Sequence, residues 1–236
     1  MESLMERTVE RNLKYERSAD IVPQELIEKE KFLIVGVGAT GRQVAKILAT
    51  MGARYITLVD PERVELVNVG SQGYTEKQVG KTKVSATLSD LKVIGGTQPV
   101  QLVGYAGVYN QASLDGKTAV FSCADSMACR EQLYNDVQDS DVLHAIDSRM
   151  GADVSEVYLM KYRGQVSEAY RDTLFSDEDA LQEACTARTT FYGATLAASL
   201  LVGTYVKCLR NSILWNKVRV DMFGGEWISE GMVRNV

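Results

Sequence analysis

Apolar residues in the first two thirds of the chain form short continuous runs separated by helical patterns. The runs occupy residues 32–35, 55–59, 100–103, 118–123 and 142–146. Runs of this kind are typical of strands buried on both faces of a parallel sheet. Between them, apolar residues recur at helical intervals, across 44–51 ahead of Gly52 and again across 84–94. The alternation predicts an α/β, Rossmann-like fold with a mostly parallel sheet flanked by helices.

Beyond Gly151 the pattern changes. Residues 154–160 and 218–223 alternate between apolar and polar side chains, which is typical of antiparallel strands toward the C-terminus. Between them, residues 190–206 resemble a membrane span but fall short of the ~20 strongly apolar residues that a bilayer requires. We therefore expect a buried helix that packs against the sheet.

The remaining segments complete the expected organisation. Residues 24–31 read as a short helix, and residues 61–74 as a long irregular connection of the kind that often carries function. We divide the chain into an N-terminal arm, residues 1–22, and a single domain, residues 23–236.

Composition narrows the class of protein. The sequence has 236 residues, 45% of them hydrophobic, which is enough for one large core. The net charge of −5 argues against DNA as a partner, because nonspecific nucleic-acid binding needs a basic surface. Residues 1–20 contain no apolar stretch, so we expect a cytoplasmic protein without a secretory signal or a membrane partner. Four cysteines without a Cys-x-x-Cys pair, and one histidine, give no reason to expect zinc.

A glycine loop follows the first apolar run. Gly36, Gly38 and Gly41 have the spacing Gly-x-Gly-x-x-Gly and lead into a helix. Such glycines allow a tight turn, close approach of a phosphate to backbone N–H groups, and close packing of helix on strand. Asp60 follows the second run, where an acidic residue binds a ribose. These residues predict a nucleotide site but fit NAD and ATP equally well.

Further motifs follow the loop in order, and one precedes it. They are Asn68-Val-Gly-Ser71-Gln72, Val79-Gly80-Lys-Thr-Lys83, Cys123-Ala-Asp125-Ser126 followed by Arg130, and upstream Leu13-Lys-Tyr15-Glu-Arg17. The ordered set resembles the ThiF/MoeB/HesA family from about Arg11 to Arg210. Members of that family activate ubiquitin-like proteins, as bacterial counterparts of the eukaryotic ubiquitin-activating enzymes.

The resemblance implies an adenylyltransferase that uses ATP and Mg²⁺. In this chemistry a carboxylate attacks the α-phosphorus of ATP, so catalysis rests on positioning and charge neutralisation. By resemblance Asp60 binds the ribose, Asn68 and Lys83 the phosphates, and Asp125 the Mg²⁺. Arg17 reaches the ATP site of another subunit, which implies a homodimer. The full set implied for the nucleotide is Gly36, Gly38, Ala39, Gly41, Asp60, Asn68, Gln72, Lys83, Asp125 and Ser126.

Each assignment has a plainer alternative. In the alternative interpretation, Lys83 is a solvated helix residue and Asp125 caps the helix that begins near Ser126. In the same interpretation, Asn68 stabilises a turn and Arg17 forms a surface ion pair. Arg130 is expected to stabilise its helix or pair with a carboxylate. Arg149 receives no role.

One position departs from the family. Members commonly have Asn-x-x-Arg-Gln, whereas this chain has Ser71 in place of the arginine that contacts the γ-phosphate. A hydroxyl does not replace a fixed, bidentate positive charge. Either Arg17, Arg63 or Lys81 supplies the charge, or ATP turnover is slow, or a partner subunit completes the site.

A thiol is the second candidate group. Cys185 matches by position the family cysteine that receives the activated acyl group, ahead of the apolar helix. The helix N-terminus and Arg188 would favour its thiolate, although a buried inert cysteine is the alternative. We expect Cys123, Cys129 and Cys208 to lie in the core.

The missing Cys-x-x-Cys pairs favour a compact bacterial or phage-like activator. Because the chain ends Val233-Arg-Asn-Val236, its substrate is expected to be a separate ubiquitin-like or sulfur-carrier-like protein with a C-terminal Gly, with a conjugating enzyme as a further candidate partner. Three alternatives remain open. They are a NAD-dependent oxidoreductase, an adenylyltransferase or ATP-dependent dehydratase acting on a small molecule, peptide or RNA, and a non-catalytic subunit that lends Arg17 to a partner.

Overall fold

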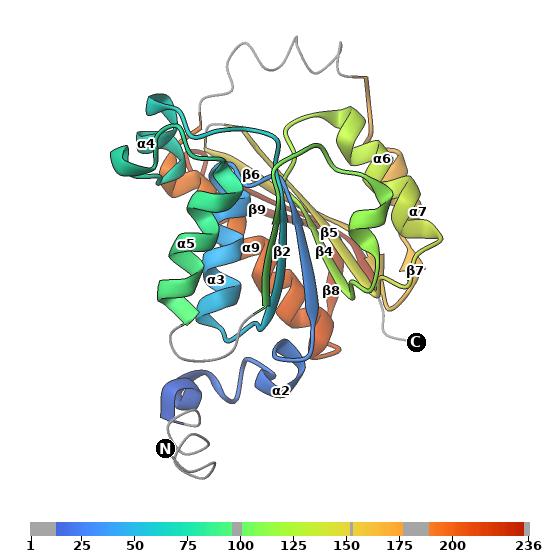
Figure 1. The fold of residues 1–236 in the computed structure, drawn as a ribbon. Helices are drawn as coiled ribbons and strands as arrows, with labels where there is room; N and C mark the ends of the chain where they lie inside the picture. Colours follow the sequence, from blue (N-terminus) through green and yellow to red (C-terminus); the bar gives the residue numbers. More distant parts are fainter. Residues whose placement is uncertain (1–12, 96–100, 152, 177–188, 234–236) are drawn as a thin grey trace.

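One mixed sheet organises the chain. The computed structural model describes residues 13–95, 101–151, 153–176 and 189–233. In this part of the chain nine strands pair in the order β3-β2-β1-β4-β5-β6-β8-β9, with β7 paired to β6 (Figure 1). The strands are β1 Lys31–Val35, β2 Tyr55–Val59, β3 Gln101–Tyr105, β4 Ala119–Ser122, β5 His144–Gly151, β6 Val154–Tyr162, β7 Gln165–Val166, β8 Leu214–Asp221 and β9 Glu226–Val233.

The sheet has a parallel half and an antiparallel half. Strands β3, β2, β1, β4 and β5 run parallel to one another, whereas the pairs β5–β6, β6–β7, β6–β8 and β8–β9 are antiparallel. The change occurs between β5 and β6, close to Gly151, where the alternation of side chains begins in the sequence. The predicted α/β class with antiparallel strands toward the C-terminus is confirmed.

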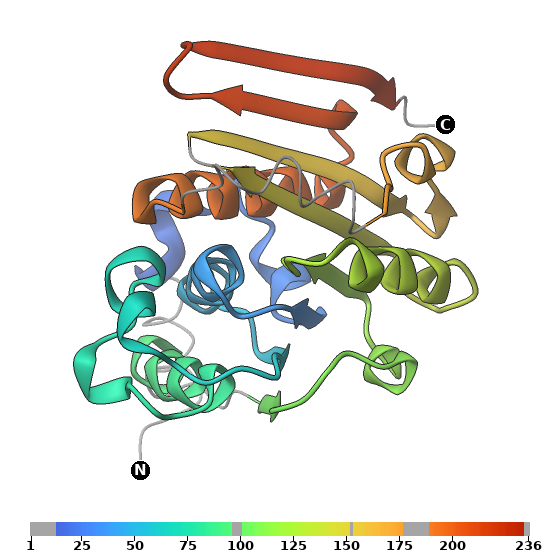
Figure 2. The ribbon, with the colours of Figure 1, turned by 90° about the horizontal axis from the view of Figure 1, so that it is seen from above.

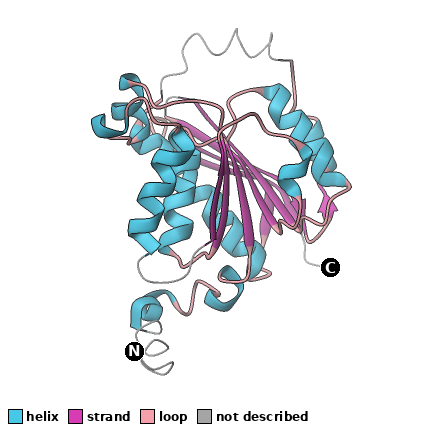
Figure 3. Cartoon of the chain, in the orientation of Figure 1, coloured by secondary structure: helices cyan, strands magenta, loops and turns pink. Residues whose placement is uncertain are grey.

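Helices cover both faces of the parallel half (Figures 1 and 3). The helices of the described residues are α2 Gln24–Ile27, α3 Ala39–Thr50, α4 Leu66–Gln72, α5 Lys83–Gly95, α6 Met127–Gln138, α7 Glu168–Arg171 and α9 Phe191–Leu209, with the 3-10 turns η1 Glu16–Ser18, η2 Glu76–Gln78 and η3 Gln111–Leu114. Phe32 and Ile34 pack with α3, α5 and α9. Leu33 and Val35 pack with α6 and α7 on the other face. Burial on both sides explains why β1 is a continuous apolar run.

Helix α9 lies against the sheet, as expected. Among the described residues it is long and apolar enough to span a membrane by length and composition, and half of that stretch is buried inside the protein. Ala197, Leu201 and Tyr205 are fully buried, and α9 contacts α3, β5 and β6. The Tyr205 ring meets the rings of Phe32 and Phe121 edge-on, each with a centroid separation of 5.4 Å. These contacts fix α9 within the core.

Three elements, α4, β9 and α2, differ from the sequence expectation. The connection 61–74, expected to be irregular, contains α4, which has no buried residue and therefore no apolar periodicity. Its start is fixed instead by a capping box, in which Glu65 and Asn68 bond reciprocally. Strand β9 was not predicted, because nearly all of its side chains are exposed on the β8–β9 hairpin that extends the sheet (Figure 2). The short helix expected at 24–31 ends at Ile27, since β1 begins at Lys31.

Candidate functional site

A cavity of about 1330 Å³ opens at the carboxyl ends of the parallel strands. It lies where the chain order reverses between β1 and β4, the usual ligand position in open α/β sheets. The structure brings nine of the ten predicted nucleotide residues to its wall. They are Gly36, Gly38, Ala39, Asp60, Asn68, Gln72, Lys83, Asp125 and Ser126. Gly41 lies behind the wall.

The glycine loop requires its glycines for steric reasons. Gly36 has φ +85°, and a Cβ there would lie 2.5 Å from the carbonyl oxygen of Cys123. A Cβ on Gly41 would lie 1.9 Å from the carbonyl oxygen of Gly36. Gly38 is the N-cap of α3 and provides no side chain to cap it. The first N–H groups of α3 are therefore left for an anion, which the helix dipole also favours.

Asp60 braces the loop and lines the cavity. Its Oδ2 accepts from the N–H of Val37 at 2.7 Å, and its Oδ1 accepts from the N–H of Glu62 at 2.8 Å. The side chain is 4% exposed, and this burial raises its pKa although both N–H groups oppose the shift. Each carboxylate oxygen retains a lone pair, so the group can still accept from a ribose hydroxyl.

Lys83 is not a solvated helix residue. It is 4% exposed, lines the cavity and forms an ion pair with Glu62. Asn68 does serve its helix, because its Oδ1 accepts from the N–H of Glu65 at 2.8 Å. Within the described residues its amide N–H groups have no acceptor, so they can still donate to a ligand.

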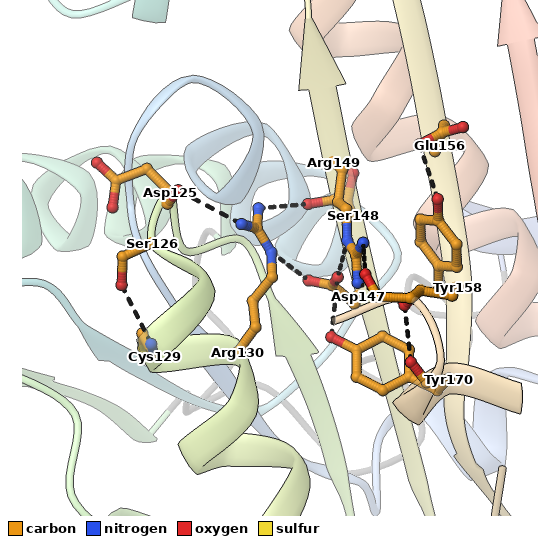
Figure 4. Close-up of polar contacts among 11 residues, drawn as sticks. Asp125, Ser126, Cys129, Arg130, Asp147, Ser148, Arg149, Glu156, Tyr158 and Tyr170 are labelled. Carbon is orange, nitrogen blue, oxygen red and sulfur yellow. Dashed lines mark hydrogen bonds and ion pairs between the residues drawn. The ribbon is translucent and has the colours of Figure 1, made fainter. Parts of the chain in front are cut away.

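Asp125 lies in the turn between β4 and α6 (Figure 4). The N-cap of α6 is Ser126, whose Oγ accepts from the N–H of Cys129 at 3.1 Å. Asp125 therefore does not cap the helix. Its side chain is exposed and, across the described part of the chain, forms no hydrogen bond or ion pair. An unpaired carboxylate on the wall of this cavity can receive a cation.

A buried ionic network behind this turn was not anticipated from the sequence. Asp147 on β5 is 0% exposed and accepts from Arg130 Nε at 3.2 Å, Arg149 Nε at 2.9 Å and the Tyr170 hydroxyl at 3.0 Å (Figure 4). Burial alone would raise the pKa of Asp147, but the two arginines outweigh burial and hold it below the ordinary carboxyl value. Arg130 thus pairs with a carboxylate, as expected.

This network supports both sides of the cavity. Arg130 Nη1 also approaches the carbonyl of Asp125 at 3.4 Å. Arg149 donates to the carbonyl and Oγ1 of Thr173, both at 2.8 Å, and stacks on the Tyr158 ring at 4.3 Å. One buried carboxylate therefore orders the Asp125 turn and the segment after α7. A sequence signal was available, since Asp147 and Arg149 continue an apolar strand without a break.

The cavity extends onto the antiparallel half of the sheet. Glu156, Tyr158 and Lys217 line it there, and Glu156 accepts from the Tyr158 hydroxyl at 2.8 Å and from Lys217 at 3.1 Å. Ligand pockets commonly have ~300–1,000 Å³, so a cavity of about 1330 Å³ has room for a second reactant beside a nucleotide. The sequence did not predict this wall.

The structure constrains what replaces the missing arginine. Ser71 is half-buried and does not line the cavity, and its hydroxyl donates to the carbonyl of Val67 at 3.0 Å. Arg63 and Lys81 are exposed and do not line the cavity; Arg63 donates to the carbonyl of Gly80. Arg17 is exposed in η1 and does not line the cavity of its own chain.

The cysteines divide into three situations. Cys185 lies outside the described residues. Cys208 is buried, as expected. Cys123 and Cys129 are half-buried: each packs against a core cluster and also lines the cavity, so the expectation of a core position is confirmed only in part, because the strand end and helix start that carry them form the cavity wall. Burial raises the pKa of the Cys129 thiol.

The residues fit a nucleotide with its metal. Gln72 Oε1 is buried without a hydrogen-bond partner in the described chain, and it is the nearest atom, at 3.8 Å, to a Cβ placed on Gly38. The described residues contain no group of three or more His, Cys, Asp or Glu side chains that would hold a metal by themselves. Mg²⁺ is commonly bound by one or two carboxylates plus phosphate oxygens, so Asp125 alone suits it when a nucleotide supplies the rest.

Comparison with known proteins identifies the class. The ThiF family matches residues 9–220, and the chain belongs to this family. It is 30% identical over 122 residues to the molybdopterin-synthase adenylyltransferase of Escherichia coli, covering 50% of this chain and 48% of that protein. It is 28% identical over 129 residues to the ubiquitin-like modifier-activating enzyme 5 of Culex quinquefasciatus, covering 49% and 32%. The chain thus spans about half the length of these relatives or less.

Solved structures show the same fold. PaaA superposes with a TM-score of 0.74 at 19% identity, covering 94% of this chain and 73% of that one. MccB of E. coli, solved with ATP, superposes with a TM-score of 0.68 at 19% identity, covering 90% and 66%. The family resemblance predicted from the motifs is confirmed.

Proposed function

We propose that this chain activates a carboxylate by adenylation at the cavity of the parallel half. The observation that carries the proposal is the unpaired Asp125 carboxylate, which shares one wall with the glycine loop and the buried Lys83. A NAD-dependent oxidoreductase needs the loop and Asp60 but has no use for these two groups. The family and the relatives named for adenylyl transfer and modifier activation support the same choice.

In the proposed reaction a substrate carboxylate oxygen forms a bond to the α-phosphorus of ATP, and the bond from that phosphorus to the pyrophosphate oxygen breaks. The N–H groups of the loop and of the first turn of α3 bind the phosphates, and Asp60 accepts from the ribose hydroxyls. Lys83 and the amide of Asn68 hold the leaving pyrophosphate. Mg²⁺ held by Asp125 would neutralise its charge.

The substrate we propose is a separate ubiquitin-like or sulfur-carrier-like protein with a C-terminal Gly, handled in the cytoplasm, with a conjugating enzyme as a further partner. The space along Glu156, Tyr158 and Lys217 supports a polymeric second reactant. A peptide or small-molecule substrate is the alternative, since MccB has also been solved in complex with MccA.

Assembly and acyl transfer complete the proposal. We propose a homodimer in which the arm, residues 1–22, presents Arg17 to the cavity of the other copy, while residues 23–236 form one domain. An arginine supplied in this way would replace the charge missing at Ser71. We propose that Cys185 accepts the acyl group from the adenylate as a thioester, with release of AMP.

Calorimetric titration tests the nucleotide assignment. The wild-type protein should bind Mg·ATP more tightly than NAD, and Asp125→Ala should weaken Mg·ATP binding by about tenfold or more while leaving ATP binding in EDTA unchanged. Asp115→Ala removes an exposed carboxylate outside the cavity and should have no effect. Tighter binding of NAD, or equal effects of the two variants, would overturn the assignment.

A further inference from the structure

Tyr74 is a buried residue behind the glycine loop. It is 3% exposed and lies between α4 and η2. Its hydroxyl donates to the carbonyl of Val37 at 2.6 Å, with Thr87 Oγ1 at 3.3 Å and the carbonyl of Lys83 at 3.5 Å. One side chain therefore connects the glycine loop with the first turns of the helix that carries Lys83.

This contact fixes the orientation of one peptide group. The N–H of Val37 is already held by Asp60, and its carbonyl is held by Tyr74. In a planar trans peptide the C=O and the following N–H point in opposite directions. Holding the Val37 carbonyl toward Tyr74 therefore turns the N–H of Gly38 away from it. Gly38 lines the cavity, whereas Tyr74 does not, and among the described residues the Gly38 N–H has no acceptor.

The Tyr74 ring is itself held in place. The guanidinium of Arg42, which is 2% exposed, stacks 3.9 Å from the ring centroid and pairs with Asp90. Gln78 Nε2 donates to the same Asp90 carboxylate at 3.0 Å. Burial raises the pKa of Tyr74 to about 12, so the hydroxyl stays protonated as a donor. The ring and the hydroxyl thus have little freedom to move away from Val37.

We propose that Tyr74 is a positioning residue for anion binding, which aims the N–H of Gly38 at a phosphate and sets the loop relative to Lys83. The proposal rests on the proposed function, since the anion is a phosphate of the nucleotide. Without the hydroxyl, the buried Val37 carbonyl has no hydrogen-bond partner, which is unfavourable. Rotation of the Val37–Gly38 peptide group then becomes favourable if it brings this carbonyl to a new donor. Rotation would present a carbonyl in place of an N–H donor to the phosphate.

Tyr74→Phe tests this, with Tyr134→Phe as the matched control. Tyr134 is 1% exposed, and its hydroxyl donates to the carbonyl of Ser167 at 3.2 Å on the opposite face of the sheet. Binding of Mg·ATP, inorganic pyrophosphate and adenosine is measured by competition with a fluorescent ATP analogue. Tyr74→Phe should weaken ATP and pyrophosphate by about tenfold and leave adenosine unchanged. Tyr134→Phe should change none of the three.

Two further measurements distinguish failure of the positioning role from failure of the proposed function. Hydrogen exchange of the segment 36–44 in the ligand-free protein should accelerate in Tyr74→Phe and not in Tyr134→Phe. Arg42→Lys keeps the hydroxyl but removes the flat face over the ring, and it should weaken pyrophosphate in the same direction by less. If the wild type binds no phosphate ligand, the proposed function fails. If it binds them, but Tyr74→Phe matches the control or weakens adenosine equally, the positioning role is wrong.

Discussion

Asp147 gives the sharpest test of how the site is supported. Asp147→Asn keeps the shape of the side chain and removes the charge shared by Arg130 and Arg149. The carboxylate is 0% exposed and its partners are 8% and 12% exposed, so water does not replace the lost interaction. Breaking a buried pair in this way typically costs ~3–5 kcal/mol; because Asn still accepts one hydrogen bond, we expect about 3 kcal/mol.

The comparison is with Glu156→Gln, which removes another carboxylate shared by two cations. Glu156 is 18% exposed, and its partners Lys217 and Arg219 are 27% and 39% exposed. Solvent screens that cluster, so its loss should cost about 1 kcal/mol or less. In thermal unfolding followed by calorimetry, Asp147→Asn should lower Tm by roughly 6–12 °C. Equal shifts in the two variants would refute the argument from burial.

The sign of the pH dependence follows from the pKa of Asp147. In the folded protein the pKa of Asp147 lies below the ordinary value of 3.8. The stability that its carboxylate contributes is therefore fully present above pH 3.8, and it is lost as the pH falls from 3.8 toward the folded pKa. The stability difference between wild type and Asp147→Asn should be constant above about pH 5 and shrink below pH 3.8. A difference that grows on acidification would contradict the sign.

Three other predictions address separate residues. His144, the only histidine of the sequence, is buried, and burial lowers its pKa from 6.5 to about 4. The free energy of unfolding should therefore fall as pH drops from 6.5 to 4, by up to ~1.4 kcal/mol per pH unit. His144→Phe should flatten that slope in denaturant titrations. Mixing Arg17→Ala with Asp125→Ala subunits should restore nucleotide turnover through one intact site per mixed dimer; no recovery despite proven subunit exchange would disprove action in trans. Cys185→Ala should retain ATP–pyrophosphate exchange with a modifier and lose the reductant-sensitive adduct on a non-reducing gel, an assay in which survival of the adduct would remove Cys185 from the mechanism.

The sequence predicted the parallel half of the fold because its strands are buried on both faces. Burial leaves a continuous apolar run, as in β1 and β2, whose observed bounds differ from the expected ones by at most one residue. Helix α4 and strand β9 bury almost nothing, so no periodicity marked them. Their positions depend on a capping box and on pairing with β8, which hydrophobic patterns do not encode.

The same distinction holds in the cavity. The loop glycines and Asp60 could be placed from sequence because they follow a fixed pattern within one β-α-β unit, in which Gly-x-Gly-x-x-Gly ends the first strand and an acidic residue ends the second. The burial of Lys83 against Glu62, and the pairing of Asp147 with Arg130, join residues from separate elements. Such contacts exist only once the sheet order is set, so the sequence pointed to Lys83 and Arg130 but not to their partners Glu62 and Asp147.

The β8–β9 hairpin decides what intrinsic fluorescence will report. Both tryptophans of the sequence lie on it: Trp215 is half-buried on β8, and Trp227 on β9 is 64% exposed. The parallel half and the glycine loop contain none. Tryptophan emission will therefore follow the hairpin, and a fluorescence midpoint below that of circular dichroism will mean that the hairpin detaches before the rest of the sheet unfolds.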